Sequence, residues 1–393
     1  MNTVDQVLSC IDSLIRHPLE PERIPLDQSL HRILREAIQA TEDQPPFHRS
    51  SIDGYLTHPD QNPGKVRLLP RLPGEPIPVL PLLGTALRIY TGSPLPPGAA
   101  LIMQEDTRIL SDQEIELLKK PSPSLVRPQG SHARKGDILL DSLSLLQPGS
   151  LALLASIGIN QPKVSRLPRV AHLVTGAELV DPSAQPRTGE IRDSNSIMIR
   201  SLLLSYPANP VWHGRIGDDR RGFADSLAEA LLHKPDLVLL SGGSSVGDHD
   251  HSGSVLEELG FKILIRQVAV RPGKPLILAQ KGEILAFGLP GNPLSHFVCF
   301  HLFVRRALDR WVNQPERHLL HADLLPGAEL KADPRETWWP CRLATRSSKF
   351  TASPLPWRDS SDLSCLAQAN GLLRIPAGQE AGSPVEVLPT ISW

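Results

Sequence analysis

The chain has 393 residues, of which 40% are hydrophobic, so it exceeds one ordinary domain and can bury a sizeable core without disulfide or metal staples. Its formal net charge is −1 and it carries no long basic block, which argues against nucleic acid as a partner. The four cysteines lie far apart without C-x-x-C spacing, and no apolar run reaches the ~20 residues of a membrane span. With no signal-peptide pattern at the N-terminus, we expect a soluble, cytoplasmic protein with reduced thiols and no membrane partner.

The first part of the chain has helical patterns. Apolar residues between Val4 and Ile15 recur at helical spacing and predict an amphipathic helix, and a second helical pattern follows Asp27. We group residues 1–45 with the return segment 138–166 as a helical and linker N-terminal domain.

The rest of the chain is predicted to form three further domains. Residues 46–137 hold short apolar pieces among proline and glycine turns, typical of a β-rich domain. Residues 167–314 alternate between strands and helices, as parallel β-α units do. Residues 315–393 read as a small C-terminal β domain. The expected fold class is therefore multidomain α/β plus β. The predicted α/β elements are strands at 170–174, 237–240 and 284–289 and a helix at 197–204.

The most informative stretch runs from Asp236 to Asp250. A buried strand ends at Ser241, and Gly242 and Gly243 then allow a sharp turn and a close approach of the backbone to a ligand. Such a turn at the carboxyl end of a strand is where open α/β sheets bind ligands, and its amides suit an anion. We therefore expect an anion site that includes Gly242, Gly243, Ser244 and Ser245.

The same loop allows a second interpretation. Gly243 to Gly247 matches the G-x-S-x-G pattern of serine hydrolases, with Ser245 as the nucleophile. A pattern of five residues arises often by chance, so the hydrolase is kept as the less favoured alternative.

Carboxylates occur at three places near predicted strand ends. Asp250 follows the glycine loop, Asp218 precedes the helix that leads to this strand, and Glu190 lies in an earlier turn. Separated carboxylates of this kind suit Mg²⁺ that bridges phosphates. His249 and His251, beside Asp250, are left without a role.

Two rigid turns complete the predicted site. Residues 271–275 place Arg271 and Lys274 on a turn fixed by prolines and a glycine, so they can present charge with little entropy to lose. Residues 289–293 end a strand and are followed by an apolar helix from Ser295, whose hydroxyl would face the same ligand.

Taken together, these segments resemble the molybdopterin molybdenumtransferase family (MoeA, and the E domain of gephyrin). The match is collinear and covers nearly the whole chain. The segments that carry it are residues 51–55, 89–96 with 103–107, 168–170 with 175–179, 189–195, 241–250, 271–275, 289–293 and 366–371.

The resemblance implies an elongated homodimer of four-domain subunits, with a molybdopterin-binding α/β third domain and a small β barrel as the fourth. It implies a reaction in which adenylylated molybdopterin and molybdate yield molybdenum cofactor and AMP, assisted by Mg²⁺. A molybdopterin adenylyltransferase would supply the substrate, and molybdoenzymes or their chaperones would accept the product.

By position in the family's motifs, the residues tied to activity are Asp53, Thr91, Glu190, Asp218 and Asp250. Glu190, Asp218 and Asp250 would hold the metal, and a second subunit would bring Asp53 and Thr91 to the cleft. The residues implied for the pterin and molybdate are Gly242, Gly243, Ser244, Ser245, Arg271, Lys274, Pro275, Pro290, Asn292, Ser295 and Ser360.

The chain departs from the family pattern at several positions. Arg271 stands where the family usually has lysine, and Ala177 replaces an Asp or Asn. Pro340 falls where a family arginine would align, and near residues 130–137 only Arg134 is a basic match. These changes keep a further alternative open, namely a molybdopterin-binding scaffold without turnover.

Overall fold

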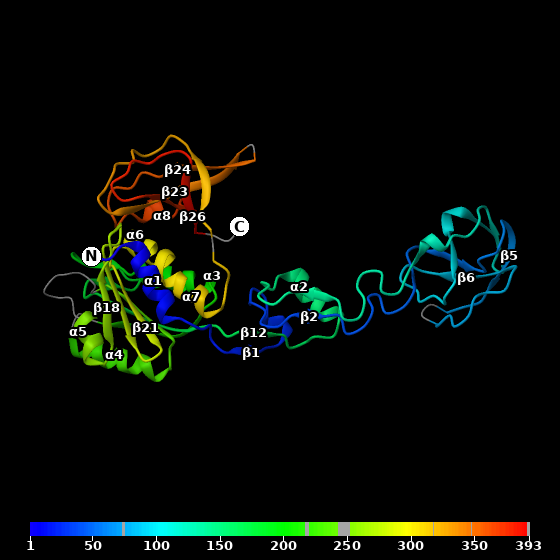
Figure 1. The fold of residues 1–393 in the computed structure, drawn as a ribbon, viewed down its shortest axis with the longest axis horizontal. Coiled ribbons are helices and arrows are strands. Elements are labelled where there is room, and N and C mark those ends of the chain that lie inside the picture. The colour runs from blue at the N-terminus through cyan, green and yellow to red at the C-terminus, as the bar shows by residue number, and fades with distance from the viewer. Residues whose placement is uncertain (73–74, 217–219, 243–251, 317, 347, 391–393) are drawn as a thin grey trace. The chain divides into compact units, whose positions relative to one another are not determined.

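The computed structural model describes residues 1–72, 75–216, 220–242, 252–316, 318–346 and 348–390 (Figure 1). It divides into two compact units, each of which is described by itself. Unit 1 comprises Met1–Ile24, His31–Ile33 and Lys163–Trp393, and unit 2 comprises Pro25–Leu30 and Leu34–Pro162. The division into four domains expected from the sequence is finer than this and stays a prediction.

Unit 1 is built around a six-stranded sheet with the order β16-β13-β17-β21-β20-β18. The pairs β16–β13, β13–β17 and β17–β21 are parallel, whereas β20 and β18 are antiparallel to their neighbours. The parallel β-α arrangement predicted for this region is confirmed. The strands are β13 (Arg169–Thr175), β16 (Asn209–Ile216), β17 (Leu237–Ser241), β18 (Lys262–Gln267), β20 (Pro275–Lys281) and β21 (Ile284–Leu289).

Helices cover both faces of this sheet because alternate residues of its strands point to opposite sides. Leu237 and Leu239 of β17 belong to the core beneath α1, α3 and α6, whereas Val238 and Leu240 belong to the core beneath α4 and α5. The helices are α1 (Val4–Leu14), α3 (Asn195–Ser205), α4 (Arg220–Leu232), α5 (Ser252–Glu258), α6 (Pro293–Cys299), a π-helical turn (Phe300–Val304), α7 (Arg305–Trp311) and α8 (Leu363–Leu366).

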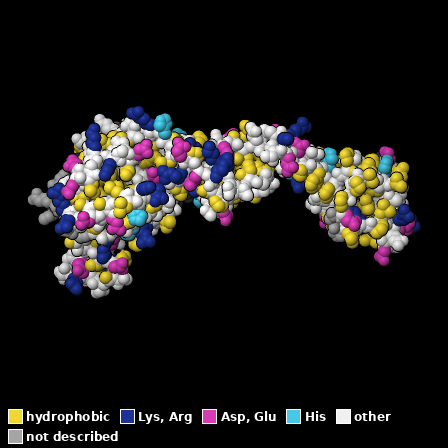
Figure 2. Space-filling view, turned by 90° about the horizontal axis from the view of Figure 1, so that it is seen from below, with side chains coloured by type: hydrophobic (Ala, Val, Ile, Leu, Met, Phe, Trp, Pro, Cys, Tyr) yellow, Lys and Arg dark blue, Asp and Glu magenta, His cyan; other side chains and the backbone are white. Residues whose placement is uncertain are grey.

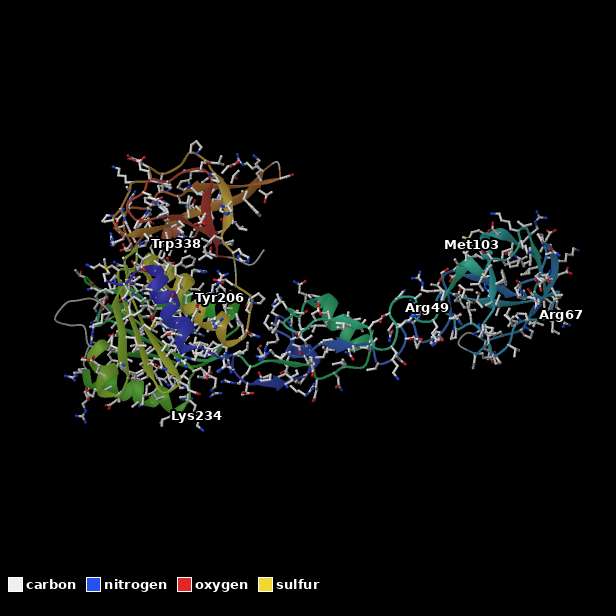
Figure 3. The ribbon with its side chains drawn as sticks, viewed as in Figure 1. Arg49, Arg67, Met103, Tyr206, Lys234 and Trp338 are labelled. Atoms are coloured by element: carbon white, nitrogen blue, oxygen red, sulfur yellow. The ribbon has the colours of Figure 1, made fainter. Side chains whose placement is uncertain are left out.

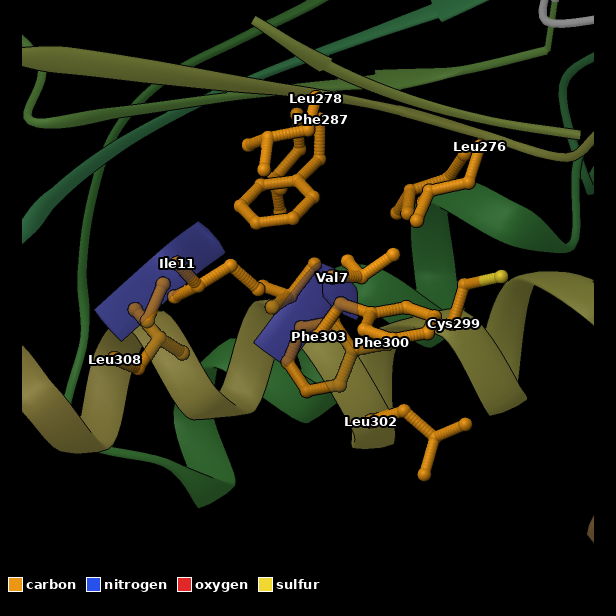
Figure 4. Packing of buried hydrophobic residues seen from close by; sticks show 14 of the residues in the cluster. Val7, Ile11, Leu276, Leu278, Phe287, Cys299, Phe300, Leu302, Phe303 and Leu308 are labelled. Carbon is orange, nitrogen blue, oxygen red and sulfur yellow. The ribbon is translucent and has the colours of Figure 1, made fainter. Parts of the chain in front are cut away.

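The predicted N-terminal helix is present and packs into this larger core. Thr3 and Gln6 form a capping box at its start. Val7 and Ile11 are fully buried beside Phe287 and the phenylalanines that follow α6 (Figure 4). Tyr206, after α3, and Trp338, from the C-terminal part, belong to the same core; both are labelled in Figure 3. One continuous apolar core therefore joins the α/β sheet to the C-terminal strands.

The C-terminal part of unit 1 is a closed five-stranded barrel. The ring runs β23-β24-β22-β26-β25 and closes because β25 also pairs with β23. The predicted C-terminal barrel is confirmed. Its strands are β22 (Leu320–Leu324), β23 (Glu336–Arg346), β24 (Lys349–Pro354), β25 (Gly371–Ile375) and β26 (Val385–Pro389), and β19 (Val270–Arg271) joins β23 from outside the ring.

Unit 2 is β-rich, as predicted for residues 46–137. Its main sheet has the order β7-β4-β6-β5-β9-β8, formed by β4 (Gly54–Thr57), β5 (Gly64–Leu69), β6 (Thr85–Ile89), β7 (Ala100–Met103), β8 (Thr107–Ser111) and β9 (Glu114–Leu117). The shorter elements of unit 2 are β2 (Ile38–Gln39), β3 (Arg49–Ser50), β10 (Val126–Arg127), β11 (Ile138–Leu140), α2 (Pro148–Ser156) and the 3₁₀ turns Leu26–Gln28, Gln104–Asp106 and Pro123–Leu125. Unit 1 also has two short pairs, β1 (Pro21–Arg23) with β12 (Lys163–Ser165) and β14 (Leu179–Val180) with β15 (Ile191–Arg192).

The prediction of a second helix after Asp27 is wrong. Only a single 3₁₀ turn, Leu26–Gln28, forms there. His31 has a φ of 60°, in the left-handed region, which an α-helix cannot contain. The apolar spacing has another cause: the side chains of Ile33, Leu34 and Ile38 are all buried, although the backbone there is not helical.

Within the described residues no helix is long and apolar enough to cross a membrane. All four cysteines are free thiols, as expected. On the face shown in Figure 2, Lys and Arg side chains are interspersed with Asp and Glu.

Candidate active site

A cleft of about 1080 Å³ lies in unit 1 at the carboxyl ends of its parallel strands. Strands β13, β17 and β21 run parallel and so end at the same edge of the sheet. Residues at or just after these strand ends line the cleft: Thr175 is the last residue of β13, Gly242 follows β17, and Pro290 and Asn292 follow β21. This is the position at which open α/β sheets bind ligands.

The glycine that follows β17 is required by its surroundings. Gly242 has a φ of 90°, and a Cβ on it would lie 2.5 Å from the carbonyl oxygen of Thr175. The backbone of the strand end is therefore packed against the neighbouring strand end, and only glycine fits there.

The turn from Arg271 to Pro275 forms a second side of the cleft. The Arg271 guanidinium is bonded to Asp333 of the barrel, with Nη1 and Oδ2 3.2 Å apart, and its carbon lies 5.7 Å from the ring centre of Trp357. Gly273, with a φ of 120°, would carry a Cβ only 2.7 Å from the sulfur of Cys299. The turn is thus held on one side by Asp333 and Trp357 and packed on the other against Cys299. These contacts orient its charges before a ligand binds.

Asp333 holds two arginines of the cleft at once. Its second carboxylate oxygen is 3.0 Å from Nε of Arg335, which also lines the cleft. Burial raises the pKa of Asp333, but the hydrogen bonds from Arg335 and the charge of Arg271 outweigh burial, so its pKa is lowered. The carboxylate therefore stays ionised and keeps both guanidinium groups in place.

The described lining of the cleft has more cations than anions. Lys274 is exposed and makes no ion pair with any residue that the structure describes. Two of the acids, Asp193 and Asp359, already accept hydrogen bonds from Ser196 and Ser361. A lining with this excess suits an anionic ligand. The cations are Arg192, Arg271, Lys274, Arg335 and Arg358, and the acids are Glu178, Asp193 and Asp359.

The turn after β21 is bonded to the segment that follows the barrel strand β24. Asn292 donates from Nδ2 to Oγ of Ser360 over 2.7 Å, and the backbone N–H of Leu294 donates to the Ser360 carbonyl over 2.9 Å. Ser295, only 6% exposed, also lines the cleft. The structure therefore brings together the predicted residues Asn292, Ser295 and Ser360 with Arg271, Lys274 and Pro275.

The predicted metal ligands are placed only in part. Glu190 accepts a hydrogen bond from the N–H of Arg187 over 2.8 Å and is not among the described lining residues, although its neighbours Ile191 to Asp193 are. Within the described residues no group of three or more His, Cys, Asp or Glu could hold a metal ion. The predicted residues Asp218, Gly243, Ser244, Ser245, His249, Asp250 and His251 lie outside the described residues.

Asp53 and Thr91, which the family resemblance ties to activity, form a hydrogen-bonded pair in unit 2. Oδ1 of Asp53 accepts from the Thr91 N–H over 2.7 Å and from its hydroxyl over 2.9 Å. These two hydrogen bonds lower the pKa of the exposed Asp53 carboxyl, so it stays ionised. Their role in activity stays a prediction.

Three arginines of the cleft were not predicted from the sequence, namely Arg192, Arg335 and Arg358. Arg335 and Arg358 come from the barrel region and lie far along the chain from the turn that they face. Pro340, where a family arginine was expected, lies within β23 opposite Leu372. A cation therefore does reach the cleft from this domain, although not from the aligned position.

Three parts of the chain match known protein families. Residues 2–158 match the family described as "MoeA N-terminal region (domain I and II)", residues 171–310 match the "Probable molybdopterin binding domain", and residues 327–390 match the "MoeA C-terminal region (domain IV)".

Relatives match over most of their length. The chain is 31% identical to the molybdopterin molybdenumtransferase of Bacillus subtilis, over 94% of this chain and 90% of that one. It is 32% identical to that of Haemophilus influenzae, over 80% and 79%. A solved structure, the molybdopterin biosynthesis MoeA protein of Pyrococcus horikoshii, covers 100% of this chain and 99% of its own, with 27% identity and a TM-score of 0.77. The chain belongs to the molybdopterin molybdenumtransferase family of molybdenum-cofactor biosynthesis.

Proposed function

We propose that this protein inserts molybdenum into adenylylated molybdopterin, using molybdate and releasing AMP. The observation that carries the proposal is the cleft itself. It collects the three parallel strand ends, the Arg271–Pro275 turn and the Ser360 segment into one lining with an excess of positive charge. Both substrates are anions, and such a lining favours anions.

Molybdate would bind at the cationic turn. It is a compact dianion, and Lys274 is an exposed cation of this turn with no ion-pair partner among the described residues. Arg271 is held by Asp333 and lies over the ring of Trp357, so its remaining N–H groups are already oriented. The Ser295 hydroxyl adds a neutral donor beside them.

The pterin and its phosphates would lie across the strand ends. Gly242 lets the end of β17 pack against Thr175 of the neighbouring strand, and the turn from Pro290 to Asn292 is fixed by Ser360. No described side chain is placed as a covalent nucleophile, so we attribute catalysis to positioning and electrostatics.

Mg²⁺ belongs to the proposal through Glu190, Asp218 and Asp250. Of these the structure describes only Glu190, and one of its oxygens already accepts from Arg187. The described carboxylates do not make a metal site by themselves, so no step is assigned to the ion.

The proposal includes a homodimer in which the Asp53–Thr91 pair of one subunit serves the cleft of the other. Mixed dimers test this directly. Dimers that combine an Asp53→Ala subunit with a Lys274→Ala subunit would regain up to about half of wild-type activity if each site needs both subunits, because one of the two sites is then intact. Activity no higher than in either parent would reject the shared site.

The test of the function itself is AMP release. The purified protein is incubated with adenylylated molybdopterin and Mg²⁺, with and without molybdate, and AMP and active cofactor are measured. Molybdate-dependent release of AMP together with cofactor formation is the expected result. Tight pterin binding without AMP release would instead establish the scaffold.

A further inference from the structure

A chain of buried hydrogen bonds lies directly behind the cleft. His172, on β13, is 2% exposed, and its Nε2 lies 2.6 Å from Oγ of Ser241 at the end of β17. Its other ring nitrogen, Nδ1, lies 3.2 Å from Nδ1 of His213 on the edge strand β16. One histidine thus links the solvent-facing edge of the sheet to the central strand end.

The chain continues from Ser241 to the turn that follows β21. Oγ of Ser241 lies 3.4 Å from Nε2 of His296 on α6, which is fully buried. Nδ1 of His296 lies 3.0 Å from the carbonyl oxygen of Pro290. Ser241 and Pro290 both line the cleft, so the chain connects two of its strand-end loops from behind.

The chemistry of the last bond fixes the direction of all the others. A carbonyl oxygen only accepts, so Nδ1 of His296 carries the hydrogen and Nε2 accepts from the Ser241 hydroxyl. Ser241 then accepts from Nε2–H of His172, which leaves Nδ1 of His172 to accept from Nδ1–H of His213. With all three imidazoles neutral, every donor inside the chain meets an acceptor.

We propose that His172 and His296 are positioning residues, which hold the Ser241 and Pro290 strand ends in fixed relation and so preserve the shape of the cleft between them. The structural part of the inference stands on the hydrogen bonds alone. Its effect on turnover rests on the proposed function.

Two charged groups near the hydrogen-bond chain affect the pKa values of its histidines, one on α3 and one in the turn before α3. Arg200 of α3 disfavours a further positive charge on His172 and His213, and Asp193 favours one on His213 and His296. Burial has the largest effect on all three and lowers their pKa values, that of His296 to about 4. The three histidines of the hydrogen-bond chain are therefore neutral at pH 7, as the hydrogen-bond pattern requires.

The first test is the tautomeric state of each ring, read by NMR of the full-length protein labelled with ¹⁵N-histidine. Single His→Gln variants assign the signals. We expect His296 and His213 to be Nδ1–H tautomers and His172 an Nε2–H tautomer at pH 7. An Nε2–H tautomer or an imidazolium at His296 would overturn the inference.

The second test separates positioning from simple packing. His296→Asn places an amide N–H near the position of Nδ1, so it can still donate to the Pro290 carbonyl, whereas His296→Leu cannot. His301 provides a matched control, since it is also buried, follows α6 in the same helical run and does not line the cleft.

We expect His296→Leu to raise the KM for adenylylated molybdopterin, which is proposed to lie across these strand ends, about 10-fold, the size of one unsatisfied buried acceptor, with a smaller change in kcat. His296→Asn should recover most of this loss, and His301→Leu should leave KM unchanged even where it lowers stability. Equal KM values in all three variants would overturn the positioning role. If the wild-type protein releases no AMP, the proposed function fails, and the NMR result still decides the hydrogen-bond chain.

Discussion

The two sides of the cleft are built in opposite ways. On the Arg271–Pro275 side, charge is exposed and oriented by the barrel through Asp333 and Trp357. On the other side, His172, Ser241 and His296 form a buried, neutral hydrogen-bond chain. The difference indicates a division of labour in which the exposed cations attract the ligand and the neutral chain keeps its binding surface in shape.

Lys274→Ala should have the largest effect on activity and a small one on stability. The ammonium group is exposed and unpaired among the described residues, so its loss removes ligand contacts and little folding energy. We expect kcat/KM for AMP release to fall about 100-fold, as when one electrostatic donor is removed from an active site.

Lys281→Ala is the matched control, because Lys281 is an exposed lysine at the end of β20, the strand that begins directly after Lys274. Its kcat/KM should stay near that of the wild type. Equal losses in the two variants would show that general charge, rather than the position of Lys274, matters.

Gly273→Ala should break the geometry of the cationic side without removing a charge. The new Cβ would meet the Cys299 sulfur and force a side chain into a left-handed φ. We expect about 2 kcal/mol of destabilisation and roughly 30-fold lower kcat/KM. Gly149→Ala in α2, where nothing lies within 4 Å, serves as control and should lower neither stability nor kcat/KM.

Acid should destabilise unit 1 through protonation of His296 in the neutral hydrogen-bond chain. The pKa of His296 is about 4 in the folded protein against the ordinary 6.5, so below pH 6.5 the unfolded chain binds more protons and unit 1 loses stability as the pH falls. His296 alone should account for about 2 kcal/mol at pH 5.

Tryptophan fluorescence can follow this transition selectively, since all five tryptophans that the structure describes lie in unit 1. Urea midpoints should fall between pH 6.5 and 4.5 in the wild type and less steeply in His296→Asn. A wild-type midpoint that does not change over this range would contradict a neutral histidine chain.

Asp333→Asn should have the smallest effect. It weakens the hold on Arg271 and Arg335 but leaves both cations in the cleft. We expect the KM for molybdate to rise about 5-fold with kcat nearly unchanged, because positioning is weakened and charge is kept. A fall in kcat/KM as large as the one expected for Lys274→Ala would assign Asp333 a direct role.

The local features of this site could be predicted from the sequence. The strand Leu237–Ser241 is a buried apolar run that ends in small residues, and its position and parallel neighbours follow from that pattern. Residues 271–275 and 289–293 were recognised because prolines and glycines fix their backbones locally, and both turns do line the cleft.

The features that depend on distant contacts could not be predicted. His172 and His296 are far apart in the sequence, and nothing in their local patterns shows that Ser241 lies between them. Arg335 enters the cleft only because Asp333 pairs with it and with Arg271 across the barrel junction. The prediction of a second helix was wrong although its apolar spacing is a local pattern. That spacing does not show that His31 has a positive φ, which interrupts a helix.

The most direct test of the central claim is the position of bound molybdenum. Crystals of the full-length protein with molybdate and adenylylated molybdopterin would be measured near the molybdenum absorption edge. We expect an anomalous peak within about 4 Å of the Lys274 ammonium nitrogen, as a charge-assisted contact requires. A peak at another cation cluster, such as Arg67, Arg71 and Arg88 of unit 2, with none in the cleft, would contradict it.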